Sequence, residues 1–134
     1  MKSGEVSYKV TGPDDFRFLC WSQDIYAIFT NLIDNSLWWM NEKKSPDRKI
    51  TVDIVNEGDS LLHIDYRDTG PGIEPSLIES EVIFEPQFST KPEGTGLGLA
   101  IAGEAAARND LELTAFKSRQ GAYFRLQTKT EGKT

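Results

Sequence analysis

The sequence predicts an α+β fold, a two-layer α/β sandwich in which a mixed, mostly antiparallel sheet carries helices on one face. A length of 134 residues with 38% hydrophobic content suits a single core. Two segments show helical periodicity, and several shorter ones alternate between apolar and polar residues as half-buried strands do. We therefore expect one domain over residues 1–128 and a disordered polar tail over residues 129–134.

The first part of the chain predicts an edge strand followed by a long helix. Val6, Tyr8 and Val10 alternate with polar residues, and residues 12–15 then break the pattern. Residues 24–40 have helical spacing, with an expected buried stripe of Ile25, Ile28, Phe29, Leu32, Ser36 and Met40. We expect Ser22 to cap this helix, which ends well before Pro46.

The middle of the chain predicts two strands and then an irregular segment. The strands contain Ile50, Val52 and Ile54, and Leu62, Ile64 and Tyr66, with a turn at residues 57–59. Residues 74–93 carry Pro75, Pro86 and Pro92 and have no clear period, so we expect no regular structure there. About twenty such residues inside one domain are uncommon and indicate a functional loop.

A second helix and a hairpin complete the expected fold. The helix covers residues 97–108 and ends at Asn109, a residue that tolerates a left-handed cap. Residues 111–116 and 122–128 then form a hairpin that turns at residues 119–121.

Composition excludes several classes of partner. The net charge is −6 and no cluster of Lys or Arg outweighs it, so we expect no nucleic-acid partner. The single cysteine, Cys20, lies among apolar neighbours, which favours a buried thiol in a reducing cytoplasm. No apolar run approaches the roughly 18 residues of a membrane span. We expect a cytoplasmic domain without direct membrane contact, even if it is part of a membrane-attached protein.

Two asparagines on the long helix form the first candidate site. Asn31 and Asn35 are four residues apart, so both carboxamides leave the helix on one face, beside the apolar stripe. Amide oxygens are hard ligands that suit Mg²⁺. Taken alone, the pair is more typical of a solvated helix surface.

An aspartate and two glycines follow the second predicted strand of the middle region. Asp68 has the strand parity of Ile64 and Tyr66, so its carboxylate should lie at the mouth of the core and need a hydrogen-bond donor. The exocyclic amine of adenine is such a donor. Gly70 and Gly72 let the backbone turn beneath a purine. An ordinary surface turn is the alternative for this Asp-Thr-Gly-Pro-Gly sequence.

A glycine run opens the second helix. Its sequence, Gly94-Thr-Gly-Leu-Gly-Leu99, precedes unpaired N–H groups at the positive end of a helix dipole, where phosphates bind. A Rossmann turn is excluded because no parallel strand directly precedes the glycines, and a P-loop because no Gly-Lys-Ser/Thr follows.

The segment between the two glycine motifs is expected to act as a lid over the nucleotide. Phe84 and Phe88 would anchor it, while Ser89, Thr90 and Lys91 reach the phosphates. A long surface loop with its aromatic side chains in the core is the alternative.

These four motifs, in this order, resemble the ATP-binding catalytic domain of sensor histidine kinases. That domain belongs to the superfamily of gyrase, Hsp90, histidine kinases and MutL, which share the Bergerat fold. The resemblance spans about residues 25–126, and the sequence Phe84-Glu-Pro-Gln-Phe-Ser-Thr-Lys91 is closest to the kinases.

The resemblance implies a set of site residues and the cofactors ATP and Mg²⁺. Asn35 would ligate the metal, Asp68 would bind adenine, and Asn31 and Lys91 would act at the transferring phosphate. The implied nucleotide-binding residues are Asn31, Asn35, Trp38, Asp68, Gly70, Gly72, Ile73, Thr90, Lys91, Gly94, Thr95, Gly96, Leu97, Gly98 and Leu99.

The resemblance also implies phosphotransfer to a histidine outside this chain. Hydrolysing members of the superfamily usually carry a Glu as general base where this chain has Asn31, and an amide cannot take a proton from water. The only histidine, His63, lies in a strand and should face solvent with Asp65 and Arg67. The expected partners are therefore a histidine-containing dimerisation domain and, through it, a response regulator.

Two departures from the kinase pattern keep alternatives open. Trp38 and Trp39 stand where many kinases have a basic residue and an aromatic one, and Gln87 replaces a common Phe. We expect Trp39 in the core and Trp38 at the wall of the site or packed at the surface. The alternatives are a degenerate nucleotide-binding scaffold and an ATPase that drives conformational change.

Overall fold

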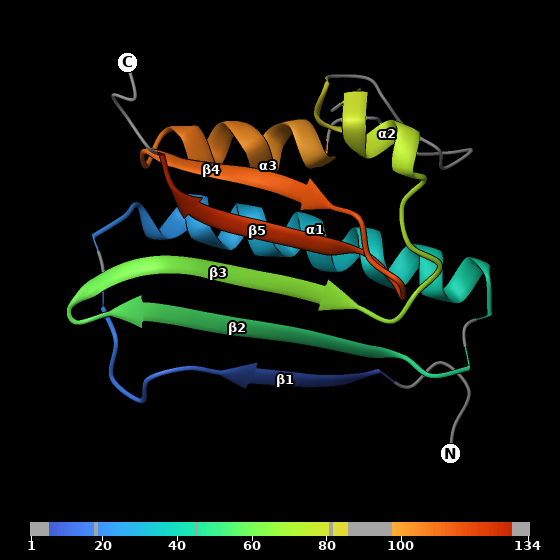
Figure 1. The fold of residues 1–134 in the computed structure, drawn as a ribbon, viewed down its shortest axis with the longest axis horizontal. Coiled ribbons are helices and arrows are strands. Elements are labelled where there is room, and N and C mark those ends of the chain that lie inside the picture. The colour runs from blue at the N-terminus through green and yellow to red at the C-terminus, as the bar shows by residue number, and fades with distance from the viewer. Residues whose placement is uncertain (1–5, 18, 45, 81, 86–97, 130–134) are drawn as a thin grey trace.

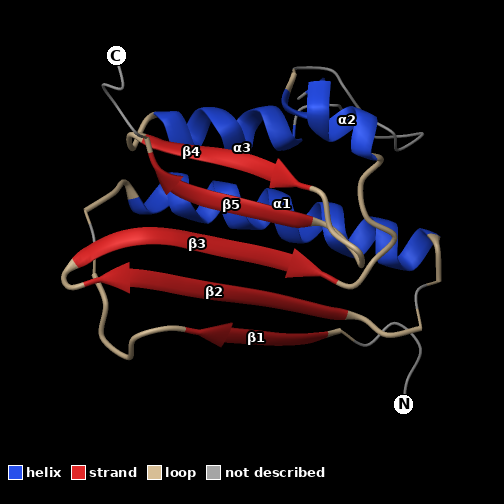
Figure 2. Cartoon of the chain, viewed as in Figure 1, coloured by secondary structure: helices blue, strands red, loops and turns tan. Residues whose placement is uncertain are grey.

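The computed structural model describes residues 6–17, 19–44, 46–80, 82–85 and 98–129. In chain order the elements are β1 (Ser7–Thr11), α1 (Ser22–Glu42), β2 (Lys49–Glu57), β3 (Ser60–Asp68), α2 (Pro75–Ser80), a 3₁₀ turn (Val82–Phe84), α3 (Gly98–Ala107), β4 (Leu111–Phe116) and β5 (Tyr123–Thr128) (Figure 1). Figure 2 shows the strands gathered in one sheet, with α1 and α3 behind it.

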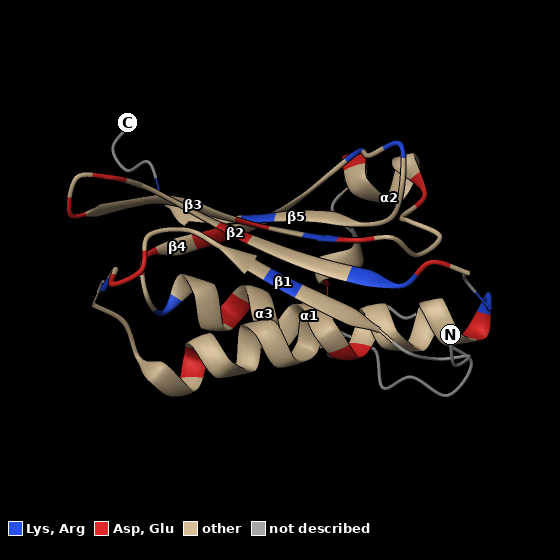
Figure 3. Cartoon of the chain, turned by 90° about the horizontal axis from the view of Figure 1, so that it is seen from below, with Lys and Arg blue, Asp and Glu red and all other residues tan. Residues whose placement is uncertain are grey.

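The sheet has the strand order β1-β2-β3-β5-β4. Its edge strand β1 pairs with β2 in parallel, and the other neighbouring pairs are antiparallel. Seen edge-on, α1 and α3 form a second layer on one face of this sheet (Figure 3). The predicted fold class, a two-layer sandwich with a mostly antiparallel sheet, is confirmed.

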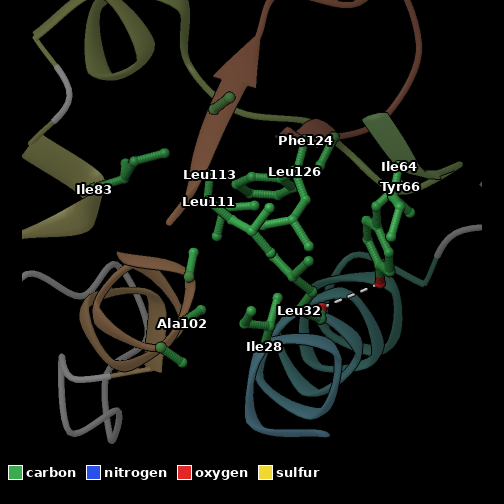
Figure 4. Close-up of a cluster of buried hydrophobic side chains, with 14 of the residues drawn as sticks. Ile28, Leu32, Ile64, Tyr66, Ile83, Ala102, Leu111, Leu113, Phe124 and Leu126 are labelled. Atoms are coloured by element: carbon green, nitrogen blue, oxygen red, sulfur yellow. Dashed lines mark hydrogen bonds between the residues drawn. The ribbon is translucent and has the colours of Figure 1, made fainter. Parts of the chain in front are cut away.

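The core lies between the helices and the sheet because both layers present an apolar face there. From α1 the buried residues include Ile28, Leu32 and Met40, as the helical period predicts. From the sheet, Tyr66 and Phe124 are 1% and 2% exposed, and their rings meet edge to face (Figure 4). Alanines on the inner side of α3 let it approach α1 closely.

The predicted strand parity fails at the start of β3. Leu62 was expected in the core but is 46% exposed, while its neighbour Leu61 is 7% exposed. The register between β2 and β3 shifts at Val55 and Asn56, so a β-bulge rotates this end of the strand by one residue. From Ile64 onward the predicted parity holds, and Asp68 lies on the helix face.

The segment predicted to be irregular contains regular structure in its described part. Residues 75–80 form α2 and residues 82–84 a 3₁₀ turn. Leu77, Ile78 and Phe84 pack against the core, and Ile83 is buried in it. This segment has too few apolar residues to reveal a helical period in the sequence, but they are enough to anchor a helix of about one and a half turns. Residues 86–93 lie outside the described part.

Helix ends also differ from the prediction. Ser22 is the first residue of α1, and the cap position belongs to Trp21, which makes no side-chain capping bond. After α3 it is Asp110, with φ 58°, that adopts the left-handed conformation rather than Asn109. The Asn109 side chain instead accepts a hydrogen bond from the Trp21 backbone N–H and donates to Asp24, tying the two helices together.

The sole histidine faces away from the helices as predicted, but it is not solvated. The His63 side chain is 18% exposed, and its Nε2 lies 3.4 Å from Asp65 Oδ2. Asp65 in turn accepts two hydrogen bonds from Arg125, across the β3–β5 ladder. His63 is therefore part of a paired polar cluster on the face of the sheet opposite α1 and α3.

The structure also bears on the expectations for Cys20, for a membrane span and for the C-terminal tail. Cys20 is half-buried, and burial, aided by the nearby Asp24 carboxylate, raises the pKa of its thiol. No helix among the described residues has the length and apolar character to span a membrane. Of the tail predicted to be disordered over residues 129–134, residues 130–134 lie outside the described part. Lys129, its first residue, is described, and its backbone N–H donates to the Asp110 carbonyl.

The Asp24–Arg108 pair gives the domain an acid-sensitive contact. Hydrogen bonds from Arg108, supported by Asn109, lower the pKa of the Asp24 carboxyl below its usual value of 3.8. Because the folded-state pKa is depressed, this stability is present above the unfolded value and lost as pH falls through the folded one. We expect Asp24→Asn to melt at lower temperature at neutral pH, with the difference shrinking below about pH 4.

Thermal melts at several pH values would check this expectation. Asp34→Asn, an exposed position of the same helix, is the control and should leave the profile unchanged. A deficit of Asp24→Asn that stays constant from neutral to acid pH would contradict it.

Candidate functional site

Four elements end or begin at one end of the sandwich, on the right in Figure 1. There β3 ends at Asp68, β5 and α3 begin, and the second half of α1 crosses behind them. The predicted motif residues of the described part gather here, from positions far apart in the sequence.

Asp68 is the best-anchored polar group of this end. Its side chain is buried, at 7% residue exposure, and its Oδ1 accepts backbone hydrogen bonds from Gly70 N (3.0 Å) and Ala122 N (2.9 Å). Its Oδ2 accepts one from Ser36 Oγ at 2.5 Å. A carboxylate has about four acceptor positions, so the described residues fill three and leave one on Oδ2. Asp68 thus does not depend on a ligand for its donors, which corrects the sequence argument, but it can accept one more.

The Ser36 hydroxyl links this carboxylate to a second buried hydroxyl, that of Tyr66. Ser36 Oγ lies 2.7 Å from the Tyr66 hydroxyl. The same hydroxyl lies 3.1 Å from the Leu32 carbonyl oxygen (Figure 4). Ser36 is buried because it occupies the apolar stripe of α1, and Tyr66 because it shares the strand face of Asp68. Burial is the main cause of a strongly raised pKa of the Tyr66 hydroxyl, so it stays protonated.

The glycines of the Asp68 loop have neighbours within the protein. A side chain at Gly70 would come within 2.9 Å of Met40 Cγ, and Gly72, with φ 88°, faces the Gly121 carbonyl. The tightest position is Gly121, with φ 73°, where an added Cβ would lie 1.8 Å from the Asp68 carbonyl oxygen. These contacts keep the loop, the start of β5 and the Asp68 carboxylate in one fixed arrangement.

The two asparagines occupy one face of α1, as predicted, and Asn31 lies beside the start of α3. Asn31 Nδ2 donates to the Ala27 carbonyl at 2.8 Å, and a Cβ added at Gly98 would lie 3.2 Å from Asn31 Oδ1. The amide oxygen thus lies at the first residue of α3. Asn35 is half-buried, and its carboxamide makes no hydrogen bond to the described ranges of the chain.

The tryptophan pair is placed differently from the expectation for Trp39. The two rings meet edge to face, with centroids 4.8 Å apart, and Lys43 Nζ lies 5.6 Å from the Trp39 ring. Both side chains are half-buried, and the core position at this end of α1 belongs to Met40. One residue along a helix is a rotation of about 100°, so Met40 and Trp39 cannot share the core equally.

Other predicted site residues are only partly placed. Ile73 packs against the core and Phe84 packs edge-on against Phe124, at a centroid distance of 6.3 Å. Gly98 and Leu99 begin α3. Thr90, Lys91, Gly94, Thr95, Gly96 and Leu97, with Gln87, Phe88 and Ser89, lie outside the described residues.

Sequence reasoning missed the partners of Asp68. Ser36 was assigned to the buried stripe and Tyr66 to the buried strand face, but neither was given a function. A hydroxyl predicted to be buried must find a hydrogen-bond partner, and that rule would have linked them. Gly121 was expected only as part of a turn, and nothing in the sequence pattern shows its contact with Asp68.

Comparison with known proteins gives this arrangement its class. The family model described as histidine kinase-, DNA gyrase B- and HSP90-like ATPase matches residues 22–132, so the chain belongs to this family. The relatives and solved structures compared below are histidine kinases by name.

Two relatives are sensor kinases of bacteria. The chain is 39% identical over 93 residues to histidine protein kinase SaeS of Staphylococcus aureus (strain USA300), covering 65% of this chain and 25% of SaeS. It is 46% identical over 101 residues to sensor histidine kinase ZraS of Salmonella typhi, covering 75% of this chain and 20% of ZraS. The chain thus spans a quarter or less of either relative.

Solved structures share the fold. The catalytic domain of histidine kinase ThkA, in a nucleotide-free form, superposes with a TM-score of 0.75 at 24% identity, covering 92% of this chain and 78% of that one. Full-length ShkA in complex with AMPPNP gives a TM-score of 0.69 at 21% identity, covering 93% and 26%. The expected family and fold are therefore confirmed.

Proposed function

We propose that this domain binds Mg-ATP and donates the γ-phosphate to a histidine on a separate dimerisation domain, from which a response regulator is phosphorylated. Family membership and the kinase relatives support this proposal. The observation that carries it is the Asp68 carboxylate, rigidly held and left with a single acceptor position.

Adenine fits that position. Its exocyclic amine donates where a guanine presents a carbonyl, so a fixed acceptor distinguishes the two bases. Because Asp68 Oδ1 is saturated by Gly70 and Ala122, the base would approach Oδ2. Hydrogen bonds to a charged group contribute about 1.5–3 kcal/mol, which is sufficient for base selectivity.

The two asparagines and the start of α3 fit the other end of the nucleotide. The carboxamide of Asn35 has no partner among the described residues, so its oxygen is available to a hard cation. Asn31 Oδ1 lies beside Gly98, where the first N–H groups of α3 favour anionic oxygens. Bound Mg²⁺ would neutralise phosphate charge, while these residues would position the phosphates for transfer.

The acceptor histidine belongs to another domain in this proposal. His63 has the opposite strand parity to Asp68, so it lies on the face of the sheet opposite α1 and α3, and its imidazole Nε2 is 3.4 Å from Asp65 Oδ2. It does not face α1 or α3. The domain therefore supplies positioning and charge neutralisation, and not the nucleophile.

Asn31 separates this proposal from the hydrolysing alternative. Its amide nitrogen already donates to Ala27, and a carboxamide has no basicity with which to activate water. We therefore expect no steady phosphate release from this domain alone. Steady release without an acceptor domain would favour an ATPase cycle instead.

We expect Asn35→Ala to remove the Mg²⁺ dependence of ATP binding, because the metal loses its protein ligand. Calorimetric titration of a non-hydrolysable ATP analogue, with and without Mg²⁺, measures this dependence. Asn41→Ala, an exposed asparagine of α1, is the matched control and should retain it. An Asn35→Ala protein that still requires Mg²⁺ would exclude Asn35 as the ligand.

A further inference from the structure

A buried line of oxygen atoms leads from α1 to the Asp68 carboxylate. It runs from the Leu32 carbonyl to the Tyr66 hydroxyl (3.1 Å), on to Ser36 Oγ (2.7 Å) and on to Asp68 Oδ2 (2.5 Å). Tyr66, Ser36 and Asp68 are 1%, 4% and 7% exposed, so water does not compete for these contacts.

The hydrogen bonds of this line point toward Asp68, because the line has fewer protons than contacts. With Asp68 ionised, only the two hydroxyl groups contribute protons, while three contacts need one each. The charged oxygen at the shortest distance takes the Ser36 proton. The single proton of the Tyr66 hydroxyl is then shared between Ser36 Oγ at 2.7 Å and the Leu32 carbonyl oxygen at 3.1 Å, which also accepts a backbone bond within α1.

Tyr66 also prevents the Ser36 hydroxyl from donating to its own helix. A serine inside a helix tends to donate to the carbonyl four residues earlier, and for Ser36 that residue is Leu32. The Tyr66 hydroxyl lies against this carbonyl and also against Ser36 Oγ. The Tyr66 hydroxyl therefore blocks a hydrogen bond from Ser36 to the Leu32 carbonyl, so Ser36 donates to Asp68 instead.

We propose that Tyr66 is a positioning residue for adenine selection, acting through the Ser36 hydroxyl to hold Asp68 Oδ2 as an oriented acceptor. Oδ1 is held independently by the backbone at Gly70 and Ala122, so the effect concerns the oxygen that has the open position. This inference rests on the proposed function, because it assigns a role within the same nucleotide site.

The test compares two nucleotides in the wild type and in Tyr66→Phe. The probes are ATP and purine-riboside triphosphate, which lacks only the exocyclic amine, titrated calorimetrically with Mg²⁺. In the wild type we expect ATP to bind at least tenfold more tightly. In Tyr66→Phe this preference should fall at least threefold, with affinity for the amine-free nucleotide unchanged within twofold.

If the lost hydroxyl had only a structural effect, the affinities for both nucleotides would fall equally, and this result would overturn the proposal. Tyr123→Phe is the matched control, because Tyr123 lies on the opposite face of the sheet, where its hydroxyl accepts from Arg125. It should keep the full preference for ATP. Thermal melts confirm that each variant is folded.

Ser36→Ala provides the second variant. It should reduce the preference for ATP by itself, and adding Tyr66→Phe should reduce it no further, because both changes interrupt one line. Additive losses would mean that Tyr66 acts by another route. A wild type that binds neither nucleotide would refute the proposed function itself, whereas tight ATP binding with an unchanged preference in Tyr66→Phe would refute only this inference.

Discussion

An Asp68→Asn protein is expected to fold normally and to bind ATP at least tenfold more weakly than the wild type. The fold survives because the amide fits the existing contacts. Its oxygen still accepts from Gly70 and Ala122, while its NH₂ group donates to Ser36. Ser36 is then free to donate to Tyr66, and Tyr66 to the Leu32 carbonyl, so every contact of the line has a proton.

The loss of affinity follows from the same reversal. In place of the acceptor Oδ2, the asparagine presents an N–H to the adenine amine, so two donors face each other and no hydrogen bond forms. Losing a hydrogen bond to a charged group costs about 1.5–3 kcal/mol, and a tenfold change corresponds to about 1.4 kcal/mol. Calorimetric titration measures the change, and Asp59→Asn, in the exposed turn between β2 and β3, is the control. Unchanged affinity in a folded Asp68→Asn protein would exclude Asp68 as the adenine acceptor.

Gly121→Ala is expected to destabilise the domain by about 3 kcal/mol or more, since it combines backbone strain with a steric clash. The residue has φ 73°, and an added Cβ would lie 1.8 Å from the Asp68 carbonyl oxygen and 2.8 Å from its Oδ1. Backbone cannot move aside as a flexible side chain does. The start of β5 would separate from the end of β3, where Asp68 N donates to the Ala122 carbonyl.

Gly58→Ala separates the two causes. Gly58 has φ 60° in the turn after β2, and a Cβ there would have nothing within 4 Å. This control therefore experiences only the left-handed backbone penalty, about 1–2 kcal/mol. Denaturant unfolding of both variants measures the difference. Equal losses would show that the contact between Gly121 and Asp68 contributes nothing.

Periodicity predicted the elements of this fold well because the sandwich buries one face of each long element. The apolar stripe of α1 contains Ile28, Leu32 and Met40 as expected, and Ser36 with them. Where the backbone departs from a regular period, the pattern is misleading, as the bulge at Leu62 shows. The short helix α2 has too few residues to establish a period at all.

The site was predictable as separate motifs and not as a network. Sequence motifs singled out Asp68 and the asparagines as candidates because their residue types are unusual at those positions. They did not show that the protein itself supplies three donors to Asp68, since two of those donors, Ser36 and Ala122, come from distant segments. Backbone groups such as Ala122 N have no sequence signature. Contacts of this kind depend on how the elements pack.

The most direct measurement is calorimetric titration of the purified domain with a non-hydrolysable ATP analogue, with and without Mg²⁺ and with the corresponding GTP analogue as the base control. A site built around the single open acceptor of Asp68, with Asn35 as metal ligand, predicts micromolar, Mg²⁺-dependent binding that is selective for adenine. A folded domain that binds neither nucleotide, or binds both equally, would contradict it.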